Sequence, residues 1–188
     1  MYRVFLVDDE PLICKGLRET VEWDSLGLEI AGEAHNGMDA MEMIAATHPH
    51  IIITDIRMPG MDGISLIKAI REKDLNIRII ILSGYSDYQF LKEAIRLGVD
   101  GYLLKPIDTD ELISNLKNLV STIEKEQLQT LRLYRGLELL RANTLNRLVT
   151  GEIGRCEFDE KATLLDICLD AEHYQCAICA PASQSDDA

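Results

Sequence analysis

Short apolar runs alternate with longer amphipathic stretches through about the first 120 residues of the chain. The apolar runs predict five strands, at Arg3–Val7, Glu29–Ala34, Ile51–Thr54, Arg78–Leu82 and Gly101–Leu104. The stretches between them have apolar residues at helical spacing and predict helices at Pro11–Val21, Met38–Ala46, Ile64–Glu72, Tyr88–Leu97 and from about Asp110. Strand and helix therefore alternate five times.

This alternation indicates the fold class. Strands separated by helices pair in parallel through right-handed crossovers, which place helices on both faces of one sheet. The central runs, such as Ile51–Thr54, are apolar at successive positions, as in strands buried between two helix layers. We therefore predict an α/β fold with a doubly wound parallel sheet.

The last helical pattern continues well beyond the part of the chain that predicts the sheet. From Leu112 to Arg147 a 4-3 spacing has eleven positions, of which seven are apolar. The early positions are expected to pack on the sheet, and the later ones to form a short paired-helix seam with a second copy. Polar residues such as Glu126 and Thr130, and the glycine at position 136, weaken such a seam. An amphipathic helix that packs within its own chain is the alternative.

Beyond Gly151 the pattern changes. Residues Glu157–Leu169 predict a helix and Tyr174–Ala180 an apolar strand, followed by a polar tail. One helix and one strand cannot bury a core of their own. We therefore expect three parts, namely a sheet domain, a helical linker that is a candidate dimerisation helix, and the truncated start of a second domain, at residues 1–122, 123–150 and 151–188.

The charge balance excludes several kinds of partner. Acidic residues number 32 against 19 basic ones, a formal net charge of −13, which offers no attractive surface to nucleic acid or to an anionic membrane. No apolar run approaches the ~18 residues of a membrane span, and the N-terminus lacks the form of a signal peptide. The five cysteines form no disulfide framework, as is usual in a reducing compartment. We expect a cytoplasmic chain that itself binds neither nucleic acid nor membrane.

Polar residues stand where four of the predicted strands end. They are the acidic pair Asp8 and Asp9, then Asp55, Ser83 and Lys105. Because the carboxyl ends of parallel strands meet at one edge of a sheet, we expect these side chains to share a site. Carboxylates this close repel one another unless a cation joins them. A few oxygen ligands completed by water favour Mg²⁺ or Mn²⁺.

A partly coordinated divalent ion beside a lysine is suited to phosphoryl transfer. Both cations offset the charge of a transferring phosphoryl group, and Asp55 is then a candidate nucleophile that forms an acyl phosphate. Ser83 could hydrogen-bond one phosphoryl oxygen, and Lys105 another.

Four motifs surround these strand ends, in the order VFLVDDEP, HIIITDIRMPGMDG, IIILSGYSDY and GYLLKP. At these separations they closely resemble the receiver domain of two-component response regulators, over about residues 1–122. The resemblance implies a flavodoxin-like (βα)5 sheet of strand order 2-1-3-4-5, a sensor histidine kinase as partner, and phosphorylation of Asp55. It also implies Mg²⁺ bound directly by Asp9 and Asp55, mostly through water by Asp8, and by the backbone carbonyl of Arg57.

The resemblance further implies a conformational switch. Ser83 and Tyr102 look like the hydroxyl and aromatic pair that respond to the phosphoryl group, Lys105 would contact the phosphate, and the Lys105–Pro106 peptide bond would be cis. The response would reach the face of the fourth and fifth helices, a second candidate surface for a homodimer. The chain looks most like regulators that end in an AraC-type helix-turn-helix domain, which is absent here. DNA binding and transcriptional control are therefore expected of a longer parent protein only.

Two other functions fit part of the pattern. A phosphatase with an aspartyl nucleophile resembles a D-x-D arrangement on the first strand, whereas Asp8 and Asp9 are adjacent and the third acid follows another strand. A receiver-like module that no longer takes phosphate is disfavoured, because every acidic, hydroxyl and lysine position is filled. We expect a phosphoacceptor switch rather than an enzyme. The bulky Arg57 and Tyr85, two positions after Asp55 and Ser83, predict slow loss of the phosphoryl group.

Overall fold

The structure is a computed structural model and describes residues 1–73, 75–84 and 88–168. The chain divides into two compact units, Met1–Glu124 and Lys125–Ala188. Among the described residues, none of the helices combines the length and the apolarity that crossing a membrane requires.

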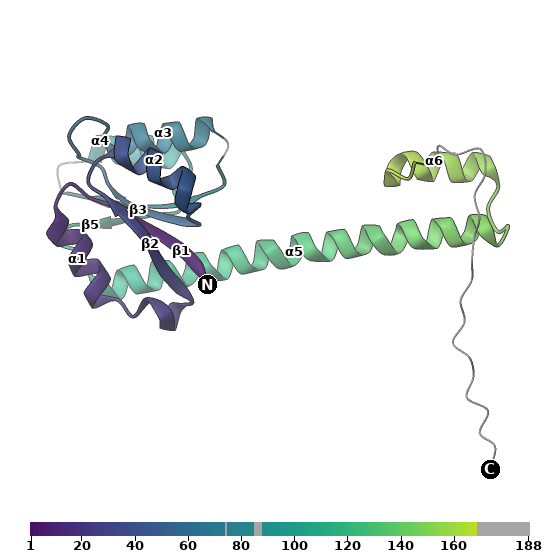
Figure 1. The fold of residues 1–188 in the computed structure, drawn as a ribbon, viewed down its shortest axis with the longest axis horizontal. Helices are drawn as coiled ribbons and strands as arrows, with labels where there is room; N and C mark the ends of the chain where they lie inside the picture. Colours follow the sequence, from purple (N-terminus) through teal and green to yellow (C-terminus); the bar gives the residue numbers. More distant parts are fainter. Residues whose placement is uncertain (74, 85–87, 169–188) are drawn as a thin grey trace, which may run out of the picture. The chain divides into compact units, whose positions relative to one another are not determined.

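A five-stranded parallel sheet forms the centre of unit 1 (Figure 1). The strands are β1 (Tyr2–Val7), β2 (Leu28–Ala34), β3 (Ile51–Asp55), β4 (Arg78–Ser83) and β5 (Gly101–Leu104). Their order across the sheet is β2-β1-β3-β4-β5, and every neighbouring pair is parallel. The flavodoxin-like order expected from the resemblance is confirmed.

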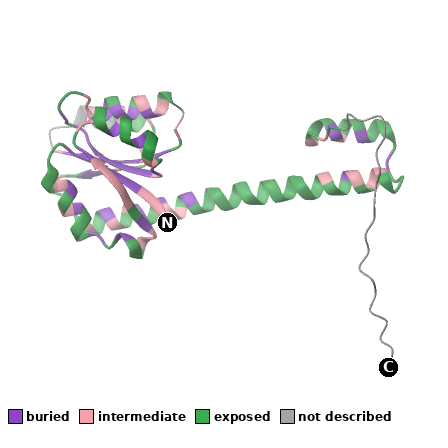
Figure 2. Ribbon diagram, in the orientation of Figure 1, coloured by how far each residue is buried: buried purple, intermediate pink, exposed green. Residues whose placement is uncertain are grey.

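Helices cover both faces of this sheet. They are α1 (Pro11–Thr20), α2 (Gly37–Thr47), α3 (Gly63–Glu72), α4 (Tyr88–Arg96) and the first part of α5 (Thr109–Val149). Buried side chains of α1 and α5 pack on one face of the sheet, and those of α2, α3 and α4 on the other. Figure 2 shows the strands largely buried between these layers. Two apolar cores therefore share one sheet.

The isoleucine run of β3 explains why this strand lies at the centre. Ile51 and Ile53 point into the core beneath α1 and α5, whereas Ile52 points into the core beneath α2 and α3. All three side chains are almost completely buried. Each such burial stabilises the fold by roughly 1.5–3 kcal/mol, so a strand covered on both faces favours apolar residues at successive positions.

Side-chain caps determine where two of the helices begin. The Asn36 side chain accepts a hydrogen bond from the backbone N–H of Asp39 (2.9 Å) and starts α2. The Asp62 side chain accepts one from the N–H of Ser65 (2.7 Å) and starts α3. Each helix therefore begins one residue earlier than its apolar spacing predicted, because these caps satisfy otherwise unpaired N–H groups.

A short 3₁₀ helix, η1 (Trp23–Leu26), was not predicted. It connects α1 to β2 and ends at Gly27, which has a positive φ of 70°. The Trp23 ring is buried, and its indole N–H donates to the carbonyl of Leu17 at 3.2 Å. Four residues are too few for a helical period to be visible in the sequence.

Unit 2 contains the part of α5 after Glu124 and a second helix, α6 (Arg155–Leu165). The predicted helix Glu157–Leu169 is thus two residues late at its start. It also ends too late, because Asp166 adopts a left-handed conformation (φ 51°) that terminates α6. The predicted strand Tyr174–Ala180 lies outside the described residues.

The 4-3 repeat of α5 has different surroundings along its length. Leu112, Leu116 and Ile123 are buried in the core beneath α1 and α5, as expected. At the other end, Thr144 is buried and Leu148 packs against the small α6 cluster of Ile153, Phe158 and Ala162. At this end of the repeat the helix therefore packs within its own chain, against α6, as the alternative to a seam with a second copy expected.

Candidate functional site

Four of the predicted site residues lie at the carboxyl edge of the sheet. Asp55 and Ser83 are the last residues of β3 and β4, Asp8 follows β1, and Lys105 follows β5. The register places Asp55 beside Leu82, one residue before Ser83. The parallel order thus assembles groups that are up to 97 residues apart in the chain.

Three carboxylates gather at this edge. Asp8, Asp9 and Asp55 each offer an oxygen within 4.8 Å of those of the other two. Asp8 is 1% exposed and Asp55 7%, whereas Asp9 is exposed to solvent. Among the described residues this is the one group of His, Cys, Asp and Glu side chains with metal-binding spacing. A donor set made only of oxygens fits a hard divalent cation such as Mg²⁺ or Mn²⁺.

Backbone groups fix the two buried carboxylates. One oxygen of Asp8 accepts a hydrogen bond from the N–H of Glu10 (2.9 Å), and one of Asp55 accepts a bond from the N–H of Ile56 (2.7 Å). The Asp55 backbone is held as well, since the Thr54 hydroxyl donates to its carbonyl at 3.0 Å. Glu10 and Thr54 were not predicted as site residues, although both adjoin the acids that were.

The first residue of α3 also contacts the end of β3. A Cβ at position 63 would overlap the carbonyl oxygen of Asp55, so only glycine fits here. The N–H of Gly63 donates to the carbonyl of Ile56 at 2.9 Å. The start of α3 and the backbone of Asp55 are therefore in direct contact.

Lys105 lies between the two buried carboxylates. Its Nζ is 2.9 Å from Oδ2 of Asp8 and 3.0 Å from Oδ2 of Asp55, and 4.0 Å from a carboxylate oxygen of Glu10. Burial lowers the pKa of Lys105, but its hydrogen bonds with Asp8 and Asp55 outweigh burial, and the net pKa is raised. One ammonium group therefore offsets the charge of two acids.

Asp55 has the opposite balance. Burial raises the pKa of its carboxyl group, with a further contribution from the charge of Asp8, and the hydrogen bond from Lys105 opposes this rise only in part. The net pKa of Asp55 is above its ordinary value. Because burial disfavours the ionised form of Asp55, an additional cation at the site would stabilise that form.

The remaining predicted residues surround this group. Ser83 is buried, and its carbonyl accepts a hydrogen bond from the N–H of Lys105 at 2.7 Å. The Lys105–Pro106 peptide bond is cis, the isomer that the resemblance implied. Tyr102 lies on β5 and is 46% exposed. Tyr85 lies outside the described residues.

Arg57 follows Asp55 by two residues in the chain, and its side chain contacts α4. Its guanidinium carbon is 5.7 Å from the centroid of the Phe90 ring on α4. This contact was not predicted, because no sequence signal links two residues that far apart. It connects the loop after Asp55 to α4.

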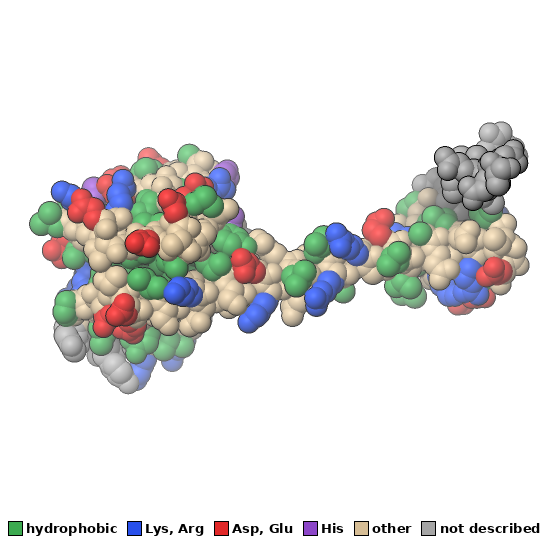
Figure 3. Space-filling view, turned by 90° about the horizontal axis from the view of Figure 1, so that it is seen from below, with side chains coloured by type: hydrophobic (Ala, Val, Ile, Leu, Met, Phe, Trp, Pro, Cys, Tyr) green, Lys and Arg blue, Asp and Glu red, His purple; other side chains and the backbone are tan. Residues whose placement is uncertain are grey.

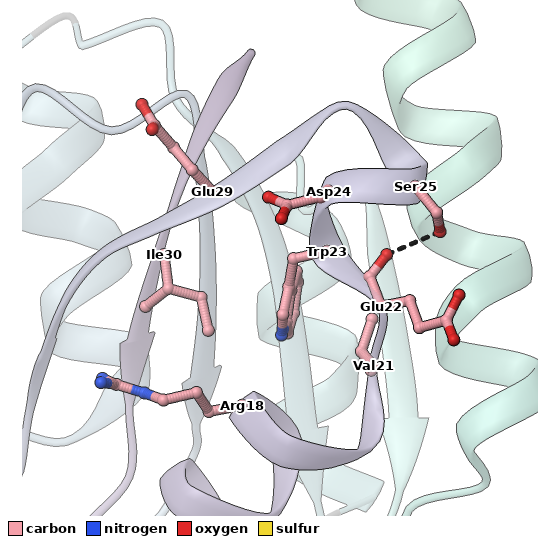
Figure 4. A pocket seen from close by; sticks show the side chains of 8 residues that line it. All are labelled: Arg18, Val21, Glu22, Trp23, Asp24, Ser25, Glu29 and Ile30. Atoms are coloured by element: carbon pink, nitrogen blue, oxygen red, sulfur yellow. Dashed lines mark hydrogen bonds between the residues drawn. The ribbon is translucent and has the colours of Figure 1, made fainter.

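A separate hollow of about 580 Å³ lies between α1, η1 and β2 (Figure 4). Its lining includes the acids Glu22, Asp24 and Glu29, with the apolar side chains of Val21, Trp23 and Ile30. The guanidinium of Arg18 also lines the hollow, and it is paired with the Glu33 carboxylate at 2.7 Å. The Ser25 hydroxyl, which also lines the hollow, donates to the backbone carbonyl of Glu22 at 2.7 Å. With its cation and its hydroxyl both engaged, the hollow is a weaker candidate site than the carboxyl edge.

Comparison with known proteins agrees with this geometry. The family model for the response regulator receiver domain matches residues 4–117. The chain belongs to the response regulator receiver family. All of the residues at the carboxyl edge from Asp8 to Lys105 lie within the matched segment.

Several regulators are similar to the chain in sequence. It is 37% identical over 156 residues to a transcriptional regulatory protein named YesN, described as uncharacterized, from Bacillus subtilis (strain 168), covering 81% of the chain and 42% of that protein. It is 37% identical over 129 residues to the transcriptional regulatory protein HptR of Staphylococcus aureus (strain NCTC 8325 / PS 47), covering 69% and 50%. The chain spans about half the length of the curated relatives it matches.

Solved structures show the same likeness. The REC domain of AraT, a response regulator from Geobacillus stearothermophilus, is 37% identical with a TM-score of 0.61, covering 67% of the chain and 98% of that structure. A two-component transcriptional regulator AraC from Clostridium phytofermentans ISDg is 35% identical with a TM-score of 0.62, covering 68% and 98%. The receiver fold of unit 1 and the family assignment therefore agree.

Proposed function

We propose that this chain is a phosphorylation-activated switch of a two-component system. A sensor histidine kinase would donate a phosphoryl group to Asp55 in the presence of Mg²⁺, and the chain would change conformation to control a downstream output. The observation that supports this most is the meeting of three carboxylates with the Lys105 ammonium at one edge of the sheet. It takes part in a single chemical event per signal and is not an enzyme with an external substrate.

The acidic residues would hold the metal ion. Asp9 and Asp55 would bind it directly, Asp8 mostly through water, and the backbone carbonyl of Arg57 would supply a further oxygen. When bound, the ion would offset the negative charge of the phosphoryl oxygens. The fit rests on the oxygen-only donor set and on the raised pKa of Asp55, which burial causes and which an added cation would counter.

The transfer would be an in-line displacement. An oxygen of the Asp55 carboxylate would form a new bond to phosphorus, while the phosphorus–nitrogen bond of a phosphohistidine breaks and the imidazole leaves with the bonding electron pair and takes up a proton. Lys105, already 3.0 Å from Asp55, would then bond a phosphoryl oxygen. The Ser83 hydroxyl would donate a hydrogen bond to another oxygen.

The response would pass through β5 to the surface of α4 and α5. Movement of Ser83 toward the phosphoryl group would open space behind it for the Tyr102 ring. Tyr102 is half-exposed in the present structure, so its ring can lose solvent contact when it turns inward. The α4 and α5 surface would thus differ between the two states, and a partner that binds one state better would shift the equilibrium.

The output would be transcriptional control by a longer parent protein. YesN and HptR are named as transcriptional regulatory proteins, and the matched segments cover 42% and 50% of their lengths. With a net charge of −13, the present chain would not bind DNA itself. A cytoplasmic histidine kinase domain and DNA as the eventual target would place the parent protein in the cytoplasm.

Phosphorylation by a small donor tests the proposal. The chain is incubated with acetyl phosphate and Mg²⁺, and its intact mass is measured beside that of the Asp55→Ala variant. We expect a gain of one phosphoryl group in the original chain and none in the variant. A gain that survives the substitution would place the phosphate on another residue. Steady turnover of a phosphate ester by the chain would favour the phosphatase alternative instead.

A further inference from the structure

Asp9 differs from the other two acids of the candidate metal site. The carboxylates of Asp8 and Asp55 each accept one hydrogen bond from a backbone N–H and one from Lys105. The Asp9 residue is exposed, and no group among the described residues hydrogen-bonds or pairs with its carboxylate. The direction of this carboxylate therefore depends on the backbone that carries it.

Groups at the end of β2 hold that backbone. The N–H of Asp8 donates to the carbonyl of Ala34 at 3.1 Å, and the ring Nδ1 of His35 lies 3.0 Å from the carbonyl oxygen of Asp8. Because a carbonyl oxygen can only accept, this hydrogen bond requires a proton on Nδ1, and His35 is the donor. The Asp8 carbonyl belongs to the planar peptide group that joins Asp8 to Asp9. Holding this carbonyl therefore fixes the direction in which the chain enters Asp9.

His35 is itself held on both sides. The residue before it, Ala34, is the last residue of β2 and is paired with β1. After it, the side chain of Asn36 caps α2, and the N–H of Gly37 donates to the carbonyl of Met61 at 3.1 Å. The backbone of His35 therefore has little freedom, and its ring is presented to the end of β1.

Position distinguishes the candidate metal site from the rest of an acidic surface. The chain has 32 acidic residues, and Figure 3 shows acidic side chains at several separate places on unit 1. Isolated exposed carboxylates attract Mg²⁺ only through charge, which salt screens. At the carboxyl edge, by contrast, oxygens of Asp8, Asp9 and Asp55 lie within 4.8 Å of one another. Affinity for the ion therefore depends on keeping the exposed Asp9 beside the two buried acids.

We propose that His35 is a positioning residue for the metal site. Its hydrogen bond orients the peptide group between Asp8 and Asp9, so that the Asp9 carboxylate stays close to those of Asp8 and Asp55. His35 lies outside the group of side chains with metal-binding spacing, so it acts through this peptide group and not as a ligand. The inference rests on the proposed function, in which Mg²⁺ occupies the site.

The size of the effect follows from what His35 holds. Loss of a group that orients a metal-binding side chain typically weakens metal binding by about 10- to 100-fold. His35 holds a peptide group instead, through one hydrogen bond, and its loss leaves all three carboxylates in the chain. We therefore expect the dissociation constant for Mg²⁺ to rise by about three- to tenfold.

Substitutions of His35 in the 188-residue chain test the proposal. His35→Leu and His35→Ala remove the donor. His35→Asn keeps it, because the amide nitrogen of asparagine is bonded to the γ carbon, as Nδ1 is, and can donate to the same carbonyl. The dissociation constant for Mg²⁺ is obtained from the rise of Tm over a MgCl₂ series at constant ionic strength. Circular dichroism in EDTA checks that all variants retain the same helix content.

We expect His35→Leu and His35→Ala to bind Mg²⁺ about three- to tenfold more weakly than the original chain, and His35→Asn to bind within about twofold of it. With acetyl phosphate as donor, the loss should appear in the Mg²⁺ concentration that gives half the maximal phosphorylation rate. The maximal rate itself should change less. A loss of Tm that is the same with and without Mg²⁺ would indicate a role in general stability and would overturn the proposal.

Three further results would contradict a positioning role. They are an unchanged Mg²⁺ affinity in His35→Leu, an equal loss of affinity in His35→Asn, and tighter binding in His35→Leu, which would mean that the imidazole acts on the ion through charge. A failure of the original chain to respond to Mg²⁺ would be a different outcome. It would remove the metal site of the proposed function and this inference together, whereas a full response in His35→Leu would overturn this inference alone.

Discussion

The Arg57 guanidinium lies over the Phe90 ring, 5.7 Å from its centroid, and connects the loop after the candidate phosphoacceptor to α4. A cation over an aromatic ring at a partly exposed site contributes about 0.5–1 kcal/mol. The contact restrains the conformation of a bulky cationic side chain that lies two residues after Asp55 in the chain. We predict that this side chain hinders the approach of water to an acyl phosphate on Asp55 and so slows the loss of the phosphoryl group.

Shortening Arg57 should therefore speed dephosphorylation. We expect Arg57→Ala to raise the rate of phosphate release from the phosphorylated chain severalfold, because water then reaches the acyl phosphate more easily. Phe90→Leu, which removes the ring and keeps Arg57, should have a smaller effect in the same direction. The rate is followed by intact mass after the donor has been removed. An unchanged rate in Arg57→Ala would show that this side chain does not limit access of water.

Removal of Lys105 should destabilise the fold. Lys105→Met leaves the carboxylates of Asp8 and Asp55 buried without their shared cation, at a cost of roughly 2–4 kcal/mol in unfolding free energy at neutral pH. The control is Lys68→Met, since Lys68 pairs with Glu93 at 2.6 Å on the surface, where solvent screens the pair, and its loss should cost much less. Urea unfolding measures both variants, and equal losses would contradict a special role for Lys105.

The sign of the Lys105 effect with pH follows from its raised pKa. A group whose pKa is higher in the folded state stabilises the fold fully below its ordinary value, here 10.5, and loses this contribution as the pH rises through the folded-state value. On the alkaline side of neutrality, the difference in unfolding free energy between the original chain and Lys105→Met should therefore shrink only above about pH 10. A difference that disappears near pH 8 would indicate another cause.

Asp55→Asn should stabilise the metal-free chain at neutral pH. Burial raises the pKa of Asp55 above its ordinary value of 3.8, so the ionised carboxylate disfavours the folded state once the pH exceeds the folded-state pKa. The neutral amide removes this penalty, and we expect Tm to rise by a few degrees at pH 7. Below pH 3.8 the acid is protonated in both states and the gain should vanish. Thermal unfolding in EDTA at several pH values measures the trend.

Mg²⁺ should stabilise the fold by binding the three carboxylates. A ligand that binds only the folded state adds about 2.7 kcal/mol at 100 times its dissociation constant, and Tm rises accordingly. Asp9→Asn should reduce the rise, because it removes an exposed member of the cluster with little effect on the core. Asp24→Asn, a change in the acidic hollow beside η1, is the control and should retain the full rise. No rise at millimolar Mg²⁺ would exclude the metal site.

Most of unit 1 could be predicted because its signals are local. The apolar runs of β3 and β4, with the helix and turn residues between them, predict a parallel sheet. The sheet in turn brings Asp8, Asp55 and Lys105 together. The starts of α2 and α3 were each displaced by one residue, because Asn36 and Asp62 cap these helices through side-chain hydrogen bonds. Spacing alone carries no information about such caps.

The sequence was uninformative where tertiary contacts determine the surroundings of a side chain. The α5 repeat looks uniform in sequence, yet Ile123 packs in unit 1, Leu137 remains exposed and Thr144 is buried within unit 2. No periodicity separates these three environments. In the same way, the sequence places Arg57 near the phosphoacceptor but contains no sign that its side chain extends over Phe90.

The contact between Gly63 and the Asp55 carbonyl restricts how this protein can vary. Any side chain at position 63 would displace the end of β3 or the start of α3, so that position accepts glycine alone. The backbone N–H of Gly63 donates to the Ile56 carbonyl, so a shift of the start of α3 away from β3 would also break this hydrogen bond. The backbone of the candidate phosphoacceptor thus restricts which residue can begin α3, a helix that has no part in the proposed chemistry.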